Sequence, residues 1–394
     1  MNKKILMTGN EAIAEGAIQA GCRFYAGYPI TPQNEITAYM AKRMPQEKGV
    51  FIQAESEISA VNMVLGAAAA GARAMTSSSS PGISLKQEGI SYLAGCQLPA
   101  VIVNIMRGGP GLGNISPSQS DYFQAVKGGG HGDYHSIVLA PSSVQEAFDF
   151  MKIAFDLADE YRTPAIILGD GMLGQMMEPL VVHGPRSTVH GKIKPTTSPA
   201  AGGSAYGGDY RLSTKKWALT GCKNRKPNII RSLLLKEGAL EELNNELQKK
   251  YSNIRTREVR CEAFNLKGAD IVLVAYGTTA RLARSVCKKS TRYKLGLIRP
   301  ITLWPFPTRI IEKAAEKAKA VLVIEMSAGQ MLEDVKLAVC GKAGVEFLGR
   351  TGGGIPTEEE IIDKIRKISV QRRVLRQAQD YSKDGEQGRT TYSV

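Results

Sequence analysis

Cysteine is scarce in this sequence of 394 residues, and no two cysteines stand close together. The chain has no Cys-x-x-Cys pair, and its six cysteines are Cys22, Cys96, Cys222, Cys261, Cys287 and Cys340. Structural zinc sites and iron–sulfur clusters need thiolates at short spacing. We therefore expect no bound metal and no iron–sulfur cluster on this chain, and we predict reduced, mostly buried thiols.

Long apolar runs are also missing. No segment approaches the roughly 18 consecutive apolar residues that a membrane-spanning helix requires, and the apolar run at the N-terminus stops at Thr8, before a signal-peptide core could form. The composition, with 43% hydrophobic and 22% charged residues, is that of a globular protein. The length favours two or three domains of about 100 to 200 residues each. We expect a cytoplasmic protein without a membrane partner.

Acidic residues are outnumbered in the C-terminal part of the chain, where residues 181–394 carry 39 Lys and Arg against 21 Asp and Glu, and this imbalance accounts for the net charge of +14. Residues 1–180 carry 12 Lys and Arg against 16 Asp and Glu, whereas residues 181–231 hold ten basic residues and one acidic residue. The second stretch includes Thr-Thr-Ser-Pro-Ala-Ala-Gly-Gly at 196–203, a composition typical of a connector. A basic patch without a recognisable motif more often faces solvent or a protein partner than a nucleic acid, so we expect no nucleic-acid partner.

Histidine is scarce too, with four residues, and none belongs to a nucleophile pattern. A hydrolytic triad is therefore not expected. His131 lies in a glycine-rich loop, where it is either a substrate contact or an ordinary loop residue. The glycine run at 108–113 contains a proline and opens no helix, so it is a poor match to a dinucleotide-binding fingerprint.

Residues 1–180 alternate short β-rich runs with helical patterns, which predicts a doubly wound α/β domain. The expected strands are at 22–28, 50–53, 72–77, 100–106, 136–140 and 165–169. The expected helices are at 11–20, 33–43, 57–70 and 143–157.

A looser pattern at 181–265 predicts a linker with an exposed amphipathic helical arm near 240–251. A second, smaller α/β domain is expected at 266–368. Its strands are predicted at 270–277, 295–299, 320–325 and 346–348, and its helices at 279–288, 308–318, 331–339 and 357–368. Residues 369–394 lack a sustained apolar period, which predicts a disordered tail.

Three segments of the first domain follow expected strands, at the edge where open α/β sheets bind ligands. In the first, Pro29 and Pro32 stiffen the loop around Thr31. Thr31 is then either a rigid hydroxyl that meets a ligand or an ordinary helix N-cap.

In the second segment, Glu55 and Glu57 stand at the start of a helix, where capping is one interpretation. That helix is apolar nearly all round, so its first turn is a candidate for a buried interface. A buried Glu57 could share a proton with a ring nitrogen, which is a general acid–base role.

In the third segment, Arg107 ends an apolar strand and precedes a glycine-rich loop. Its guanidinium is either a bidentate ligand for a carboxylate or an ordinary surface charge.

Together these segments resemble the pyrimidine-binding domain of the 2-oxoacid:ferredoxin oxidoreductases, and a later segment resembles the transketolase-C-terminal-type domain that follows it. The resemblance covers nearly all of 1–368. It is carried by Tyr-Pro-Ile-Thr-Pro at 28–32, Glu-Ser-Glu at 55–57, Ser-Ser-Pro-Gly at 79–82, Arg107, and the run from Leu297 to Pro307.

Two further runs, at 106–114 and 349–356, resemble the branched-chain (3-methyl-2-oxobutanoate) subunit type. A subunit of the 2-oxoglutarate type and a non-catalytic scaffold subunit are the alternatives. The resemblance implies an oxidative decarboxylation of a 2-oxoacid with coenzyme A that yields acyl-CoA, CO₂ and reduced ferredoxin.

The resemblance also implies the site residues. Glu57 would be the catalytic residue, protonating the aminopyrimidine ring of thiamine diphosphate. Thr31 and Arg107 would bind the substrate carboxylate. The pyrimidine pocket would be formed by Tyr28, Pro29, Ile30 and Ser80.

Gly169-Asp170-Gly171 resembles the start of the thiamine-diphosphate metal motif, but no Asn pair follows at the required distance. The resemblance therefore implies a hetero-oligomer in which a beta-type partner subunit holds the diphosphate and Mg²⁺. The other implied partners are a gamma-type subunit, a ferredoxin-like cluster subunit and an external ferredoxin.

Overall fold

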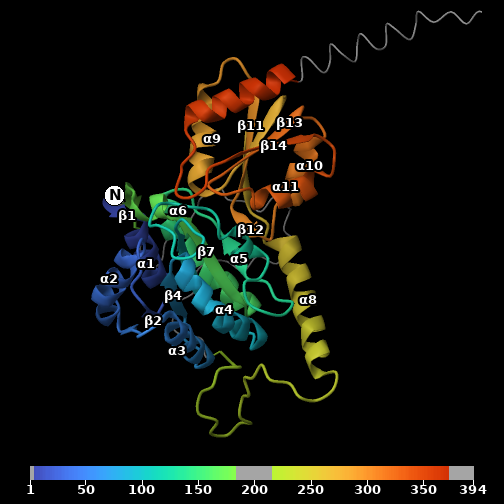
Figure 1. Ribbon diagram of the computed structural model, residues 1–394. Helices are drawn as coiled ribbons and strands as arrows, with labels where there is room; N and C mark the ends of the chain where they lie inside the picture. The colour runs from blue at the N-terminus through green and yellow to red at the C-terminus, as the bar shows by residue number, and fades with distance from the viewer. Residues whose placement is uncertain (1–3, 183–214, 372–394) are drawn as a thin grey trace, which may run out of the picture.

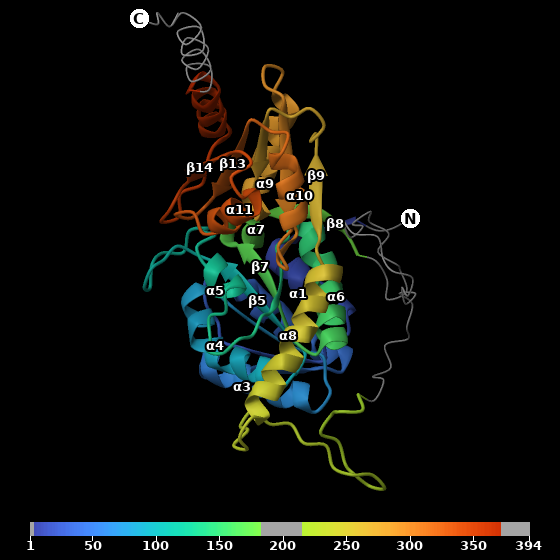
Figure 2. The ribbon, with the colours of Figure 1, turned by 90° about the vertical axis from the view of Figure 1, so that its right-hand side faces the viewer.

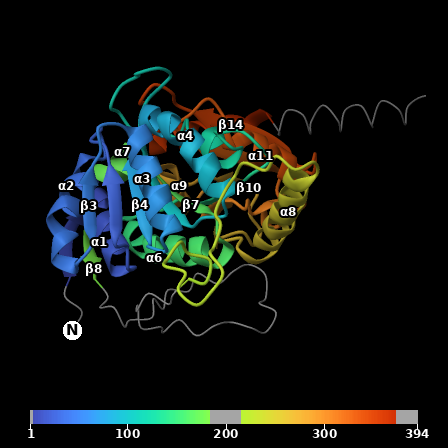
Figure 3. The same ribbon diagram turned by 90° about the horizontal axis from the view of Figure 1, so that it is seen from below.

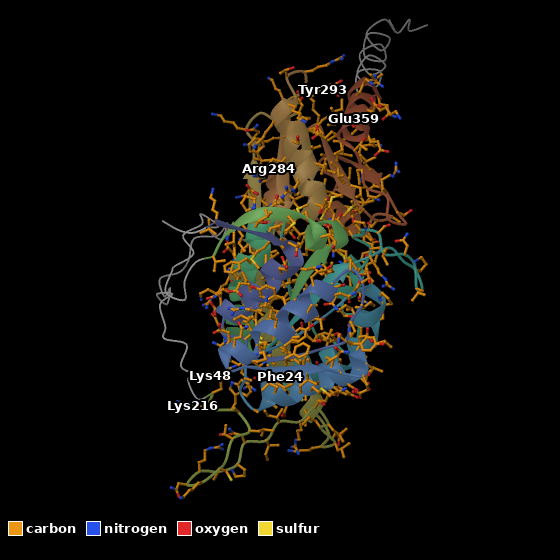
Figure 4. All side chains as sticks on the ribbon, turned by 90° about the vertical axis from the view of Figure 1, so that its left-hand side faces the viewer. Phe24, Lys48, Lys216, Arg284, Tyr293 and Glu359 are labelled. Carbon is orange, nitrogen blue, oxygen red and sulfur yellow. The ribbon has the colours of Figure 1, made fainter. Side chains whose placement is uncertain are left out.

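Two β-sheets, one above the other, organise the chain in the computed structural model, which describes residues 4–182 and 215–371 (Figure 1). Most of the predicted basic connector, and the predicted tail after residue 371, lie outside the described residues. Figure 4 places Lys48 and Phe24 at the end of the first unit that is remote from Arg284 and Tyr293 in the second unit. Lys216 lies near that remote end too (Figure 4).

The first unit is built on a seven-stranded sheet in the order β12-β6-β7-β5-β4-β2-β3. Its strands are parallel except β12, which pairs antiparallel with β6. The central strands β4, β5 and β7 are buried along their whole length, as helices on both faces require. The bounds are β2 Phe24–Gly27, β3 Val50–Gln53, β4 Ala74–Ser78, β5 Ala100–Met106, β6 Ile137–Leu139, β7 Pro164–Asp170 and β12 Thr302–Trp304.

Helices cover both faces of this sheet. α3 packs against α4 on one face, and α1 packs against α6 on the other (Figure 3). The bounds are α1 Gly9–Gln19, α2 Asn34–Arg43, α3 Glu57–Ala69, α4 Ser80–Gly95, α5 Tyr122–Val126, α6 Val144–Tyr161, α7 Gly171–Gln175 and the 3₁₀ helix η1 Pro45–Glu47. This arrangement is the predicted doubly wound α/β architecture. No helix among the described residues is long and apolar enough to cross a bilayer.

The second unit has a five-stranded sheet in the order β14-β13-β10-β11-β9, in which β9 is the antiparallel strand. The strands are β9 Cys261–Phe264, β10 Ile271–Val274, β11 Leu295–Pro300, β13 Ala320–Glu325 and β14 Gly344–Gly349. The helices are α9 Gly277–Lys289, α10 Thr308–Ala315 and α11 Met331–Val339. A further helix runs from residue 358 to the last described residue, 371.

The boundaries of the two units differ from the predicted ones. The second sheet starts before residue 266, because β9 lies in the predicted linker and pairs with β11. The last helix continues past residue 368. In addition, β12 leaves the second unit to complete the edge of the first sheet. Pairing between a strand of one unit and the sheet of the other depends on long-range contacts, which local periodicity does not encode.

The predicted helical arm is α8, Ala239–Arg257, and it is longer and less exposed than expected. It buries Leu247, Tyr251 and Ile254 along the side of the first unit (Figure 2). Their spacing of four and three residues is that of one helical face. Two strands were also not predicted: β1 Lys4–Thr8 and β8 Met177–Val181, which form a separate antiparallel pair across the predicted boundary at residue 180.

Buried polar contacts lock the two units together. Asp170, at the end of β7, accepts a hydrogen bond from the hydroxyl of Thr278 at 2.9 Å. Gln119 donates to the carbonyl of Tyr276 at 2.9 Å. Arg299, which belongs to the motif that resembles the second domain, is 4% exposed in its side chain and forms an ion pair with Glu146 of the first unit at 2.6 Å. The units therefore form one body, with the C-terminal ends of the first sheet's strands facing the second unit.

Candidate functional site

The predicted site residues lie together at one edge of the first sheet. Strands β5, β4, β2 and β3 are neighbours in that order and run parallel, so their C-terminal ends meet there. The segments that follow these four strands carry Arg107, Ser80, Thr31 and Glu57.

Glu57 is the first residue of α3 and is 6% exposed. A Cβ atom built on Gly82, in the first turn of α4, would lie 2.5 Å from Oε1 of Glu57, so the carboxylate lies directly against that turn. No hydrogen bond to this carboxylate comes from the part of the chain that the structure describes. Glu55 differs: its exposed carboxylate accepts a hydrogen bond from Ser59, as expected of a surface carboxylate near a helix start.

Arg107 is 7% exposed and connects the loop after β2 to the loop after β5. Its Nη1 donates to the carbonyl of Thr31 at 2.9 Å, and its Nη2 donates to the carbonyl of Leu112 at 3.1 Å. Its Nε is buried without a hydrogen-bond partner, and it takes part in none of the ion pairs between described residues. A buried cation without an anion is unfavourable, so this geometry fits an arginine that binds an anionic ligand.

Thr31 is exposed, and its carbonyl lies next to the Arg107 guanidinium. The alternative interpretation of Thr31 as a helix N-cap is wrong, because the N-cap of α2 is Gln33. Tyr28 is 38% exposed, Pro29 is exposed and Ile30 is half-buried, so these residues form an open rim beside Thr31.

Ser80 connects the ends of β4 and β5. Its hydroxyl donates to Asp121 at 2.6 Å and accepts from the backbone N–H of Arg107 at 3.0 Å, while its own N–H donates to Asn104 at 3.1 Å. The Ser80 hydroxyl is thus used within the chain. Its role as a cofactor contact stays a prediction.

The first turn of α4 lies between Arg107 and the Glu57 carboxylate, the two groups with predicted chemistry. Ser80 touches Arg107, and Gly82, two residues later, touches Glu57. The hydroxyls of Ser78 and Ser79, just before this turn, are buried and have no hydrogen-bond partner in the described part of the chain. Orphaned polar atoms together with a buried carboxylate suit a polar ligand bound at this edge, and they fit the pyrimidine end of thiamine diphosphate.

Sequence analysis missed three polar residues at this edge, of which Lys86 and Asn104 are buried and Asp121 is half-buried. Lys86 is completely buried, and its Nζ donates to the backbone oxygen of Glu57 at 3.2 Å. Asp121, whose pKa burial raises, and Asn104 both hold Ser80. No helix was predicted over α4, so the sequence pattern gave no signal for the burial of Lys86.

His131 is exposed on the loop after α5, where its backbone carbonyl accepts from Ser91. None of the six cysteines, all within the described residues, forms a disulfide, and three of them are buried. Burial raises the thiol pKa of Cys22 and of Cys287 to about 12. The described residues contain no group of three or more His, Cys, Asp and Glu placed to hold a metal ion.

The fold and this edge are those of a doubly wound α/β unit whose polar side chains gather at the C-terminal ends of parallel strands. Residues 15–222 match the family model described as pyruvate flavodoxin/ferredoxin oxidoreductase, thiamine diP-binding. Residues 269–361 match pyruvate:ferredoxin oxidoreductase core domain II. The chain belongs to the thiamine-diphosphate-dependent 2-oxoacid:ferredoxin oxidoreductase family, and is an oxidoreductase that works as one subunit of a complex.

Two curated relatives cover nearly the whole chain. The ketoisovalerate oxidoreductase subunit VorB of Methanothermobacter marburgensis is 49% identical over 366 residues, which is 92% of this chain and 97% of that protein. The 2-oxoglutarate synthase subunit KorA of the same organism is 40% identical over 93% of this chain and 99% of that protein. The predicted family is therefore confirmed.

Solved structures confirm the predicted fold class. The 2-oxoglutarate:ferredoxin oxidoreductase from Magnetococcus marinus, with 2-oxoglutarate, coenzyme A and succinyl-CoA bound, has a TM-score of 0.77 and 27% identity over 93% of this chain. This chain spans 65% of the length of that one. A split-gene transketolase, 12% identical over 92% of this chain and 98% of that one with a TM-score of 0.52, shares the fold alone.

Proposed function

We propose that this chain supplies Glu57 to a thiamine diphosphate whose diphosphate and Mg²⁺ are held by a beta-type partner subunit. The complex would oxidatively decarboxylate 3-methyl-2-oxobutanoate with coenzyme A, to acyl-CoA, CO₂ and reduced ferredoxin. One observation carries the proposal: the Glu57 carboxylate, which has no hydrogen-bond donor among the described residues, and the Arg107 guanidinium, which has no anion among them, are both buried and flank the same turn of α4.

Each residue has a distinct part in this scheme. Glu57 would share a proton with the aminopyrimidine ring nitrogen, because none of the described residues donates a hydrogen bond to its buried carboxylate, which leaves both oxygens available. Arg107 would bind the 2-oxoacid carboxylate beside Thr31, and Tyr28, Pro29 and Ile30 would form the rim of the pyrimidine pocket. Bound thiamine diphosphate supplies the nucleophilic carbon and takes up the electron pair released on decarboxylation.

Two observations favour an aliphatic substrate. The relatives named for ketoisovalerate are 47–49% identical, whereas four named for 2-oxoglutarate are 37–40% identical. Leu112, whose carbonyl binds Arg107, is 80% exposed, and Ile115 on the same loop is 63% exposed. Aliphatic side chains next to the carboxylate-binding group suit a branched hydrocarbon better than a second carboxylate. Rates of the purified complex with 3-methyl-2-oxobutanoate and 2-oxoglutarate distinguish the two types.

The state of Asp170 supports a partner that holds the metal. Asp170 stands in the segment that resembles the metal motif, yet its carboxylate accepts from Thr278 and from the backbone amides of Met172 and Leu173. It is therefore committed to the junction between the two units and to capping α7.

A gamma-type subunit, a ferredoxin-like cluster subunit and an external ferredoxin complete the proposed electron path, and coenzyme A takes the acyl group in the cytoplasm.

Glu57→Gln in the assembled complex tests this function. Gln keeps the size of the side chain but cannot exchange a proton, so turnover should fall by about 10²- to 10⁴-fold. Glu55→Gln is the matched control, because Glu55 is exposed and two residues away, and it should leave turnover unchanged. Full activity of Glu57→Gln would refute the catalytic role and support a scaffold subunit.

A further inference from the structure

A lysine lies completely buried beside the residue that we propose as the acid–base group. Lys86, on α4, has an exposed fraction of 0%. Lysine is almost never fully buried in proteins unless its charge is paired. Its one hydrogen bond among the described residues runs from Nζ to the backbone oxygen of Glu57, at 3.2 Å.

Two close contacts between α3 and α4 fix the position of Lys86. Gly82 lies against the carboxylate of Glu57, and a Cβ atom on Gly89 would lie 2.5 Å from Cγ1 of Val61. Positions 82, 86 and 89 share one face of α4, and positions 57 and 61 share one face of α3. Lys86 is therefore held between the two helices, with its ammonium at the first turn of α3.

The charge of Lys86 is coupled to that of Glu57. Burial lowers the pKa of Lys86 from its ordinary value to about 8, and the negative charge of Glu57 opposes this decrease. The ammonium therefore stays mostly charged at neutral pH.

The geometry lets Lys86 act without blocking its neighbour. Its ammonium binds the backbone oxygen of Glu57 and not the carboxylate, so both carboxylate oxygens remain available to another donor. The other charged groups around these first turns are Arg107 and Asp121, which meet at Ser80, and the exposed Glu55.

We propose that Lys86 is a positioning residue for cofactor activation: its hydrogen bond fixes the first turn of α3, and its buried positive charge beside Glu57 stabilises negative charge on that carboxylate. A negative charge held away from water without a nearby cation is costly, and negative charge on Glu57 is what would stabilise a protonated ring nitrogen. A nearby cation removes that obstacle. This inference rests on the role proposed for Glu57, and it adds a second residue of this chain to the half-site.

Two substitutions in the assembled complex separate the charge of Lys86 from its hydrogen bond. Lys86→Gln removes the charge but keeps a donor for the backbone oxygen of Glu57, and Lys86→Met removes both. We would measure thiamine diphosphate affinity of the cofactor-free complex by calorimetry, and the pH dependence of kcat/KM. For both variants we expect the pH at which kcat/KM falls on the acidic side of the profile to rise by about one pH unit. We also expect the affinity for thiamine diphosphate near neutral pH to weaken about tenfold.

An unchanged pH profile and unchanged cofactor affinity for Lys86→Gln would overturn the proposal. Effects seen only in Lys86→Met would overturn it as well, because the hydrogen bond and not the charge would then matter. Melting temperatures of the same samples control for misfolding. Glu57→Gln, run in parallel, separates the two proposals: if it is inactive while Lys86→Gln behaves as wild type, only the role of Lys86 fails. If Glu57→Gln is active, the proposed function itself fails.

Discussion

Arg107→Met removes the group that we propose to bind the substrate carboxylate. In the free chain the guanidinium is buried, with two hydrogen bonds to backbone oxygens and an Nε that has no partner among the residues of 4–182 and 215–371. Truncating one partner of a buried, hydrogen-bonded charge pair costs about 2 to 5 kcal/mol. At about 1.4 kcal/mol for each factor of ten, we expect kcat/KM for the 2-oxoacid to fall by about 30- to 4,000-fold.

Arg23→Met is the matched control for this substitution. Arg23 also donates from its guanidinium to two backbone oxygens, those of Ile18 and Cys22, but it precedes β2 at the opposite edge of the sheet. Both variants lose comparable contacts with the backbone, so their melting temperatures should fall by similar amounts. Steady-state assays of the assembled complex should show a loss of kcat/KM for Arg107→Met alone. Wild-type kcat/KM for Arg107→Met, or an equal loss in Arg23→Met, would refute the reasoning.

Three further predictions follow from the same contacts. Gly82→Ala should lower kcat at least tenfold, because its Cβ would lie 2.5 Å from Glu57 Oε1 and 2.1 Å from Ser78 Oγ. Gly66→Ala is the control: its Cβ would have no neighbour within 4 Å, so kcat should stay at the wild-type value in the same assay. Lys86→Met should raise the free energy of unfolding at pH 7 by up to about 3 kcal/mol in urea titrations. The pKa of Lys86 falls from 10.5 to about 8 on folding, so the charged lysine destabilises the fold below pH 8, and the side chain is neutral in both states above pH 10.5. A free energy of unfolding equal to or below that of the wild type would contradict this sign. A thiol reagent should label Cys222 and Cys340 in the native chain but not Cys22, as peptide mapping would show, and rapid native labelling of Cys22 would contradict its burial.

The parallel strands of the first unit made its site predictable. β3 and β5 have the predicted bounds, and β2 and β4 lie within a few residues of theirs. Once these strands are parallel and adjacent, the residues after them must gather at one edge. The positions of Glu57, Thr31 and Arg107 relative to one another therefore followed from local patterns together with the sheet topology.

The polar residues that hold the site were less accessible to sequence analysis. Lys86 stands in a helix beside polar residues, and nothing in the spacing alone says that it is buried rather than solvated. Its burial depends on Gly82 and Gly89, which let α3 approach α4 closely. Asp121 likewise lies in a loop whose contact with Ser80 spans 41 residues of sequence. Such contacts arise from tertiary packing, which local propensity does not determine.

The pairing of β12 and the burial of α8 could not be predicted for the same reason. β12, Thr302–Trp304, lies inside a segment that resembles the second domain, yet its backbone pairs with β6 of the first sheet. α8 was predicted as an exposed arm because its composition is highly charged, although one face carries Leu247, Tyr251 and Ile254. That face was present in the sequence, and only its partner surface was unknown.

The central claim is that Glu57 of this chain activates a cofactor anchored on another subunit. Hydrogen–deuterium exchange at the reactive C2 carbon of thiamine diphosphate, measured by quenched-flow NMR in the assembled complex, reports that activation without substrate turnover. The account predicts that Glu57→Gln slows this exchange by orders of magnitude while Glu55→Gln leaves it at the wild-type rate. Equal exchange rates in the wild type and in Glu57→Gln would contradict it.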